Sequence, residues 1–162
     1  MAYKFIVWID GDSCPKKVKD FLFNYSKSKS FLINVVANRK VELPTDNPFI
    51  NLIIVENLKD AADNHIFDNS SLNDIVVTRD ILFAQRLVEK KVTVMNDRGL
   101  IFNKDNIQDR LREREFSMNL SAIGFGGGKN NYYGEKEIKK FIAVFEREFQ
   151  THVMNEIYNI KL

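Results

Sequence analysis

Six aspartates follow closely on short apolar segments, and their spacing is the clearest sign in the sequence of a chemically active site. Asp10 and Asp12 lie two residues apart, so in an extended chain they can face the same side, as can two acids that lie three residues apart on a helix. If the apolar segments are parallel strands, their carboxyl ends share one edge of a sheet, and the acids gather there. The six residues are Asp10, Asp12, Asp60, Asp63, Asp80 and Asp97.

A cluster of carboxylates at one edge requires compensation by positive charge. Two such charges about 6 Å apart repel each other by roughly 3 kcal/mol at an effective dielectric constant of about 20. A bound cation removes this repulsion, and oxygen ligands with little histidine favour Mg²⁺ or Mn²⁺. Such an ion can activate water and neutralise phosphate charge. The predicted metal ligands and catalytic residues are Asp10, Asp12, Asp63 and Asp80.

Each aspartate also has a structural interpretation when it is considered alone. Asp12 or Ser13 can cap the first helix, and Asp80 can cap the helix that follows it. Asp60 can be a first-turn acid that the helix dipole favours. For a single acid, this structural interpretation is at least as good as metal binding. Acids that follow several strands, taken together, favour metal binding. Asp60 and Asp97 are the weakest candidates, because each has a nearby acid that is better placed.

Three basic residues are candidates for binding a phosphate-containing substrate. Arg79 and Arg98 flank the predicted edge, and their planar guanidinium groups suit phosphate, although each could equally pair with a neighbouring aspartate. Lys129 ends the segment Gly126-Gly127-Gly128-Lys129, which lacks the Walker spacing of a phosphate-binding loop. We interpret this segment as a flexible loop that could close over the site.

Other reactive side chains have simpler interpretations. Arg110, Arg112 and Arg114 alternate with acidic residues, which indicates a solvated helix face rather than a binding surface. Cys14 could be a reactive thiol, but neighbouring carboxylates oppose thiolate formation, and a packing role is the better interpretation. His65 could join the metal site or relay a proton, but a surface histidine is the simpler prediction.

The apolar pattern predicts the elements that must position these side chains. Short β-branched or aromatic runs predict strands at residues 4–9, 31–37, 49–55, 75–78 and 92–95. Apolar residues at helical spacing predict helices that begin near residues 15, 60 and 80, a charged helix over 107–116, and a last helix whose apolar stripe joins the core. Strands that alternate with helices indicate a parallel sheet covered on both faces. We predict a three-layer α/β/α fold with a mainly parallel sheet of about five strands, in a single domain over residues 1–162.

Composition narrows the class of protein further. A net charge of +2, from 24 basic and 22 acidic residues, says little about nucleic-acid partners, because the distribution of charge matters more than its sum. One cysteine and two histidines cannot form an intrachain disulfide or a structural zinc site of the usual kind. With no long apolar run and no signal-type segment, we expect a cytoplasmic protein without a membrane partner. The oligomeric state stays open.

Five separated motifs occur in order: Ile9-Asp10-Gly11-Asp12-Ser13-Cys14-Pro15, Val36-Ala37-Asn38, Asp60-Ala61-Ala62-Asp63-Asn64, Val77-Thr78-Arg79-Asp80-Ile81 and Asn96-Asp97-Arg98-Gly99. Together they resemble the YaiI/YqxD family of uncharacterised bacterial proteins, whose motifs include D-x-D-x-C-P, D-x-A-D, T-x-D-I and N-x-R-G. With the glycine-rich loop and the final helix, the resemblance covers nearly the whole chain.

The resemblance carries expectations about fold and activity. The family is grouped by similarity with PIN-like domains, which are metal-dependent nucleases whose acids lie at the carboxyl edge of a parallel sheet. It therefore implies a PIN-like domain in which Asp10, Asp63 and Asp80 bind metal and Asp12 is an additional ligand. Gly11 stands where alanine is common, which should be harmless. Asp97 stands where proline is usual, which argues against a ligand role for it.

Three functions are compatible with these observations. The first is a metal-dependent phosphodiesterase that acts on RNA or DNA. The second is a phosphatase resembling the haloacid dehalogenases, with Asp10 as nucleophile, Asp12 as acid/base and Thr78 in the second motif, although no later lysine with paired acids is evident. The third is a non-catalytic module that binds nucleic acid or protein. A dinucleotide-dependent oxidoreductase is disfavoured, because the turn after the first strand lacks the glycine fingerprint.

Overall fold

The computed structural model describes residues 3–125 and 132–158, and its elements alternate as the sequence predicts. The strands lie close to their predicted positions, and each of the first three is followed or preceded by polar turns. The strands are β1 (Ile6–Asp10), β2 (Leu32–Ala37), β3 (Ile50–Ile54), β4 (Ile75–Val77) and β5 (Thr93–Met95). The helices are α1 (Lys16–Lys29), α2 (Ala61–Asn69), α3 (Ile81–Lys90), α4 (Lys104–Ala122) and α5 (Glu135–Ile157).

The five strands form one parallel sheet in the order β3-β2-β1-β4-β5. β1 is the central strand, and Ile9 lies beside Val35 of β2 on one side and Val77 of β4 on the other. The chain builds the sheet outward from β1 in one direction and then returns to build the other half. The carboxyl ends of β1 and β4 therefore border the switch point, where ligands bind in open α/β sheets.

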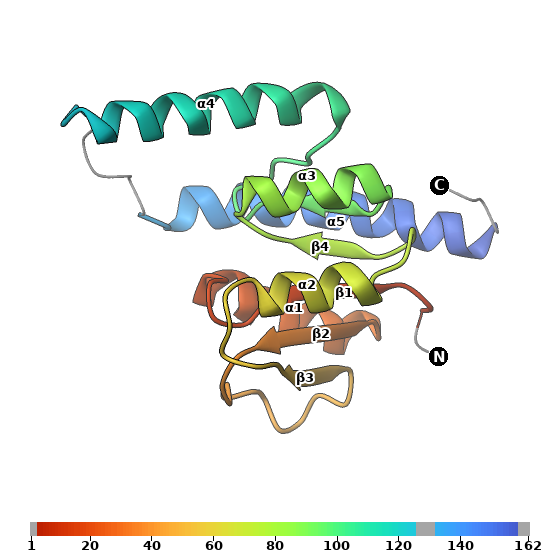
Figure 1. Cartoon of the computed structure of the whole chain (residues 1–162). Helices are drawn as coiled ribbons and strands as arrows, with labels where there is room; N and C mark the ends of the chain where they lie inside the picture. The colour runs from red at the N-terminus through yellow and green to blue at the C-terminus, as the bar shows by residue number, and fades with distance from the viewer. Residues whose placement is uncertain (1–2, 126–131, 159–162) are drawn as a thin grey trace.

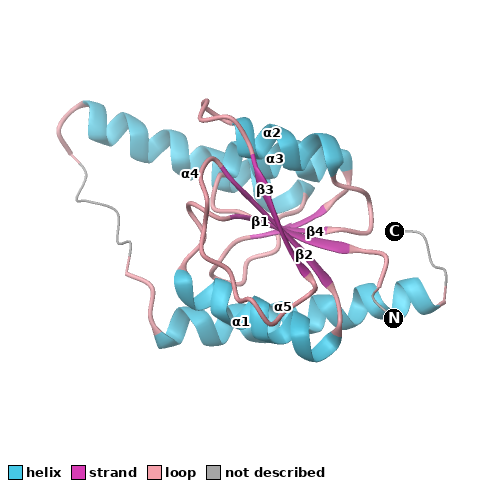
Figure 2. Cartoon of the chain, turned by 90° about the horizontal axis from the view of Figure 1, so that it is seen from below, coloured by secondary structure: helices cyan, strands magenta, loops and turns pink. Residues whose placement is uncertain are grey.

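Helices cover both faces of the sheet, which confirms the three-layer α/β/α architecture (Figure 2). Because side chains alternate along a strand, Val7 and Ile9 of β1 join the core beneath α1 and α5. Trp8 points to the opposite face and joins the core beneath α2 and α3. The predicted stripe of the last helix is confirmed as core, since five of its six predicted residues are buried: Ile138, Phe141, Phe145, Phe149 and Val153.

α4 is longer than predicted and only partly packed. It continues to Ala122, beyond the predicted end at residue 116, and lies against α3 (Figure 1). Among its described residues only Ile107 is fully buried, and an Asn103 cap with Asn106 fixes its first turn. The helix therefore depends on its first half for packing, and that half also adjoins the site described below.

Asp74 fixes the position of β1 relative to β4. Its side chain is buried, with 3% exposure, and it accepts hydrogen bonds from the Ile6 amide, the Trp8 indole Nε1 and the Ser71 amide at 2.9–3.0 Å. Because Asp74 directly precedes β4, these bonds join the start of the central strand to its neighbour. The register that brings the carboxyl ends of the two strands together thus depends on one buried carboxylate.

Candidate functional site

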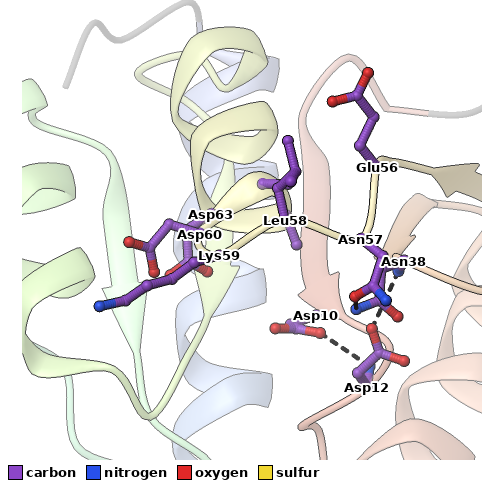
Figure 3. A pocket seen from close by; sticks show the side chains of 11 residues that line it. Asp10, Asp12, Asn38, Glu56, Asn57, Leu58, Lys59, Asp60 and Asp63 are labelled. Carbon is purple, nitrogen blue, oxygen red and sulfur yellow. Dashed lines mark hydrogen bonds between the residues drawn. The ribbon is translucent and has the colours of Figure 1, made fainter.

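Two adjoining cavities lie at the carboxyl edge of the sheet, and both are lined by Asp10 and Asp63. The first, which we call the asparagine cavity, has a volume of about 350 Å³ and is also lined by Asp12, Asn38 and Asn57 (Figure 3). The second, which we call the carboxylate cavity, has a volume of about 410 Å³. Its lining residues are Asp10, Ser13, Asp63, Thr78, Arg79, Asp80, Ile81 and Arg114.

The carboxylate cavity brings together three acids that follow different elements of the chain. Asp10 is the last residue of β1, Asp63 lies in the first turn of α2, and Asp80 follows β4 and begins α3. The Asp10 Oδ1 accepts a hydrogen bond from the Asp12 amide at 2.9 Å, which fixes that side chain at the strand end. Strand order alone therefore accounts for the meeting of three acids up to 70 residues apart in sequence.

The charges of these acids affect one another. Burial, followed by the negative charges of Asp80, Asp10 and Asp60, raises the pKa of Asp63 to about 7 from an ordinary value of 3.8, while Arg86 acts in the opposite direction. Within the described residues no donor contacts the half-buried Asp63 carboxylate. A cation in this cavity would remove the repulsion that keeps the pKa of this acid high.

The donor set fits a hard divalent cation in its chemistry, because every candidate ligand is a carboxylate oxygen. In the described part of the chain, however, no three or more His, Cys, Asp and Glu side chains are close enough to hold an ion directly. Mg²⁺ usually keeps several waters and uses only one or two carboxylates together with substrate phosphates. Acids spread around an open cavity are compatible with that mode of binding.

Asp80 and Asp12 have structural partners in addition to their position at the cavities. Asp80 caps α3, because its Oδ1 accepts a hydrogen bond from the Phe83 amide at 3.1 Å, as predicted. The carboxylate of Asp12 accepts hydrogen bonds from the Asn38 amide and the Arg39 Nε. It therefore holds the segment after β2 against the site.

The predicted cap of α1 by Asp12 or Ser13 is wrong. α1 begins at Lys16 and its N-cap is Pro15, with no side-chain cap hydrogen bond. The Asp12 carboxylate is instead directed to the segment after β2. Asp60 is likewise not a first-turn acid: it is the N-cap of α2, in the left-handed region with φ +61°, a conformation that aspartate tolerates better than most residues.

Arg79 and Asp97 form an ion pair, which is one of the two arrangements that the sequence allowed for Arg79. Asp97 is buried, so it serves to fix this arginine and does not line the carboxylate cavity. Arg79 itself remains 44% exposed and lines the cavity wall beside Asp80. The ion pair therefore positions a permanently charged group next to the acids.

Arg98 is presented by a tight turn that requires glycine. The Asn96 Oδ1 accepts hydrogen bonds from the amides of Arg98 and Leu100, and Gly99 adopts φ +81°. A Cβ at Gly99 would lie 2.9 Å from the Lys140 carbonyl oxygen, so the turn packs closely on α5. Arg98 pairs with Glu137 at 3.5 Å rather than with an aspartate.

Three residues line the cavities although the sequence does not predict them there. Arg114 lies in the wall of the carboxylate cavity, whereas its alternating charges predict a solvated face. Arg110 and Arg114 lie four residues apart and therefore share one face of the helix, whereas Arg112 between them faces another way. This spacing is the one feature of the sequence that could have placed Arg114 at the site. Asn38 and Asn57 line the asparagine cavity and are joined by a hydrogen bond of 3.0 Å.

The remaining candidates have the following positions. Cys14 packs against the apolar core, and burial raises the pKa of its thiol to about 12, which agrees with a packing role. The ring of His65 lies 6.2 Å from that of Trp8. Lys129 and the glycines before it lie outside the described residues.

Gly11 is expected to be required in this chain, which differs from the expectation that its replacement of alanine is without consequence. A Cβ at Gly11 would approach the buried Val35 Cγ1 to 2.8 Å, and valine has little freedom to move away. We expect Gly11→Ala to lower the free energy of unfolding by about 1–3 kcal/mol. Urea unfolding of G11A, V35A and the double variant should show that V35A relieves part of this loss; strictly additive effects would contradict the close contact.

Asp63→Asn is expected to stabilise the protein at neutral and higher pH. Because the folded-state pKa of Asp63 exceeds its ordinary value, the stability associated with its protonated form is present below about pH 4 and is lost as the pH rises through about 7. Asparagine removes this loss, so the variant should gain on the order of 1 kcal/mol at about pH 8 after allowance for solvent screening.

The measurement is urea unfolding in the presence of a chelator at several pH values, with Asp68→Asn on the exposed end of the same helix as control. The difference between D63N and the unmodified protein should disappear below about pH 4. Equal stability of the two proteins at about pH 8 would show that burial and the neighbouring acids do not raise the pKa of Asp63.

The fold and the site together define the chain as a three-layer α/β/α domain with acidic side chains gathered at the carboxyl edge of its sheet. Residues 8–151 match the family model described as "Uncharacterized BCR, YaiI/YqxD family". The chain therefore belongs to the YaiI/YqxD family, as its motifs predicted. Within the described residues, no helix has the length and apolar character needed to cross a bilayer.

Similar proteins carry the name "UPF0178 protein". The one from Treponema denticola is 38% identical over 135 residues, which cover 83% of this chain and 85% of that protein. The one from Maridesulfovibrio salexigens is 34% identical over 93% of this chain and 99% of its own length. The one from Pseudomonas putida is 35% identical over 87% and 93%, respectively. No solved structure matches the chain significantly.

Proposed function

We propose that this protein is a metal-dependent phosphodiesterase of the PIN-like kind that cuts RNA or DNA. The proposal depends on one observation: Asp10, Asp63 and Asp80 come from three separate segments and line one cavity at the switch point of the sheet. A set of carboxylates without histidine or thiolate suits Mg²⁺ or Mn²⁺. When bound, such an ion supplies an activated water and neutralises phosphate charge.

The other residues of the cavity complete this site. Asp10, Asp63 and Asp80 would hold the ion, with Asp12 as an additional ligand or as the group that orients water. Arg79 lies in the same wall and is held by Asp97, so its guanidinium group can hydrogen-bond a phosphate oxygen opposite the acids. Arg114 reaches the same cavity from α4. Acids and arginines that line one cavity suit a phosphodiester, which must be both held and attacked.

The structure favours this function over a phosphatase with Asp10 as nucleophile. In that alternative Asp12 would exchange protons with the group bound at Asp10, which requires a carboxyl group that can turn towards Asp10 and is not fixed elsewhere. Here both oxygens of Asp12 accept hydrogen bonds, one from the Asn38 amide and one from the Arg39 Nε. Its bonds hold it to the segment after β2 rather than above Asp10.

The test is cleavage of fluorescently labelled single-stranded RNA and DNA by the purified protein. We expect cleavage with added Mn²⁺ or Mg²⁺ and none with a chelator. Simple phosphate monoesters should stay intact under the same conditions. Absence of cleavage with either metal, or turnover of monoesters alone, would contradict the proposal.

A further inference from the structure

A third cavity adjoins the carboxylate cavity on the side of α4 and α5. It has a volume of about 440 Å³ and shares Arg79 and Ile81 with the carboxylate cavity. We call it the basic cavity, after four lining residues that carry positive charge. These are Arg79, Arg98, Arg110 and Lys140, which come from the ends of β4 and β5 and from α4 and α5.

α4 carries arginines over both cavities. Arg110 lines the basic cavity and Arg114 lines the carboxylate cavity, and the two lie one helical turn apart on the same face. Arg79 stands between the cavities because it lines both. Arginines therefore line both cavities, and Arg79 belongs to the wall that the two cavities share.

The basic cavity keeps a positive balance after its own ion pairs are counted. Two acids, Asp97 and Glu113, line it together with the four cations. Asp97 is buried against Arg79, Glu137 from outside the cavity pairs with Arg98 at 3.5 Å, and the pair of Arg110 with Glu113 is exposed, so solvent screens that last pair strongly. Lys140 makes no ion pair with any described residue. An anion that enters therefore meets the unpaired Lys140 together with arginines whose guanidinium groups have further N–H donors besides those used in their ion pairs.

The opposite side of the site has the reverse character. The asparagine cavity is lined by Asp10, Asp12, Glu56, Asp60 and Asp63 and by a single base, Lys59. A polyanion that reached the carboxylate cavity would be repelled on this side and attracted on the side of α4. The charge distribution therefore gives a bound strand one favourable direction of exit.

We propose that the basic cavity binds backbone phosphates of a single-stranded polynucleotide next to the phosphodiester that is cut. This inference rests on the proposed function and deepens it, because it assigns a second binding site to the strand and gives the direction in which the strand leaves the acids. A small phosphate ester would occupy the carboxylate cavity alone and gain nothing from Arg110 or Lys140. A volume of about 440 Å³ is that of a small-ligand site, so the cavity accepts one unit of a strand at a time.

The experiment measures binding of a labelled single-stranded RNA of about twelve nucleotides by fluorescence anisotropy. It uses Asp80→Asn with Mn²⁺, so that the strand is not cut, and adds either R110Q/K140Q or R112Q/K139Q. The second pair is a matched control, since it removes the same charge from the same helices at exposed positions that do not line the basic cavity. Thermal unfolding checks that each variant is folded.

We expect R110Q/K140Q to weaken binding by about tenfold at low salt and to reduce the slope of log affinity against log salt by about 1.4, while the control changes little. If the double variant does not fold, K140Q alone at an exposed position should weaken binding by about threefold. An RNA duplex of the same length should bind more weakly than the single strand. Equal losses for both double variants, or no loss for either, would overturn the inference.

Failure of this inference can be distinguished from failure of the proposed function. If the unmodified protein cuts RNA with metal while R110Q/K140Q binds as tightly as its control, the basic cavity has no role and the nuclease remains. If the unmodified protein cuts nothing while R110Q/K140Q still binds about tenfold more weakly, the basic cavity is a binding site and the nuclease proposal is wrong.

Discussion

Replacing Asp80 or Asp10 by asparagine is expected to lower metal-dependent cleavage of single-stranded RNA by about a hundredfold or more without loss of folding. Each substitution removes a negative charge but keeps the oxygen that the fold uses. The amide oxygen introduced by D80N can still accept the hydrogen bond from the Phe83 amide, and the one introduced by D10N can accept that from the Asp12 amide. In the native chain these bonds go to Oδ1 of each aspartate. A loss of activity would therefore result from weaker binding of the ion or the substrate and not from a change in the fold.

The control for this prediction is Asp68→Asn, at an exposed position on the same helix as Asp63. It should cut RNA at the rate of the unmodified protein. Preparations of D10N and D80N that cut as fast as the control would identify the activity as a contaminant. A rate loss that higher Mn²⁺ concentration restores would indicate that the substituted acid acts by holding the ion.

Asp74→Ala is expected to give the largest loss of stability, with the free energy of unfolding lowered by about 3 kcal/mol or more. The substitution leaves the Trp8 indole N–H and two backbone amides without their acceptor, two of these donors belonging to the central strand. Buried donors that lose their partner cost the full free energy of desolvation. Urea unfolding of D74A is the measurement, and the exposed Asp68→Ala should change stability by less than about 0.5 kcal/mol.

This prediction also concerns the site, because Asp74 sets the position of β1 beside β4. If D74A still folds at low temperature, it should lose RNA cleavage as well as stability, since Asp10 and Asp80 follow these two strands. A D74A protein as stable as the unmodified chain would contradict the role assigned to this carboxylate.

The sequence predicts the sheet well because its signals are local. Short β-branched or aromatic runs such as residues 6–9 and 75–77 indicate buried strands, and the acids that follow them then lie at one edge. The helix cap by Asp80 was equally predictable, since the acid directly precedes an amphipathic segment. In these cases a residue's role depends on its immediate neighbours in the chain.

The features that could not be predicted depend on contacts between distant segments. The choice of Arg79 between phosphate and aspartate is decided by Asp97, which follows a different strand. Asp12 serves the segment after β2 instead of α1 because β2 lies beside β1 in the sheet. Arg114 lines a cavity only because α4 packs on α3, and its alternating charges hide this in the sequence.

The most direct test of the central claim is a crystal of the protein grown with Mn²⁺ and measured for anomalous scattering. We expect a peak in the cavity that Asp10, Asp63 and Asp80 line, and its absence in crystals of D10N/D80N grown in the same way. A map without such a peak, or with peaks only at exposed carboxylates elsewhere, would show that these acids do not form a metal site.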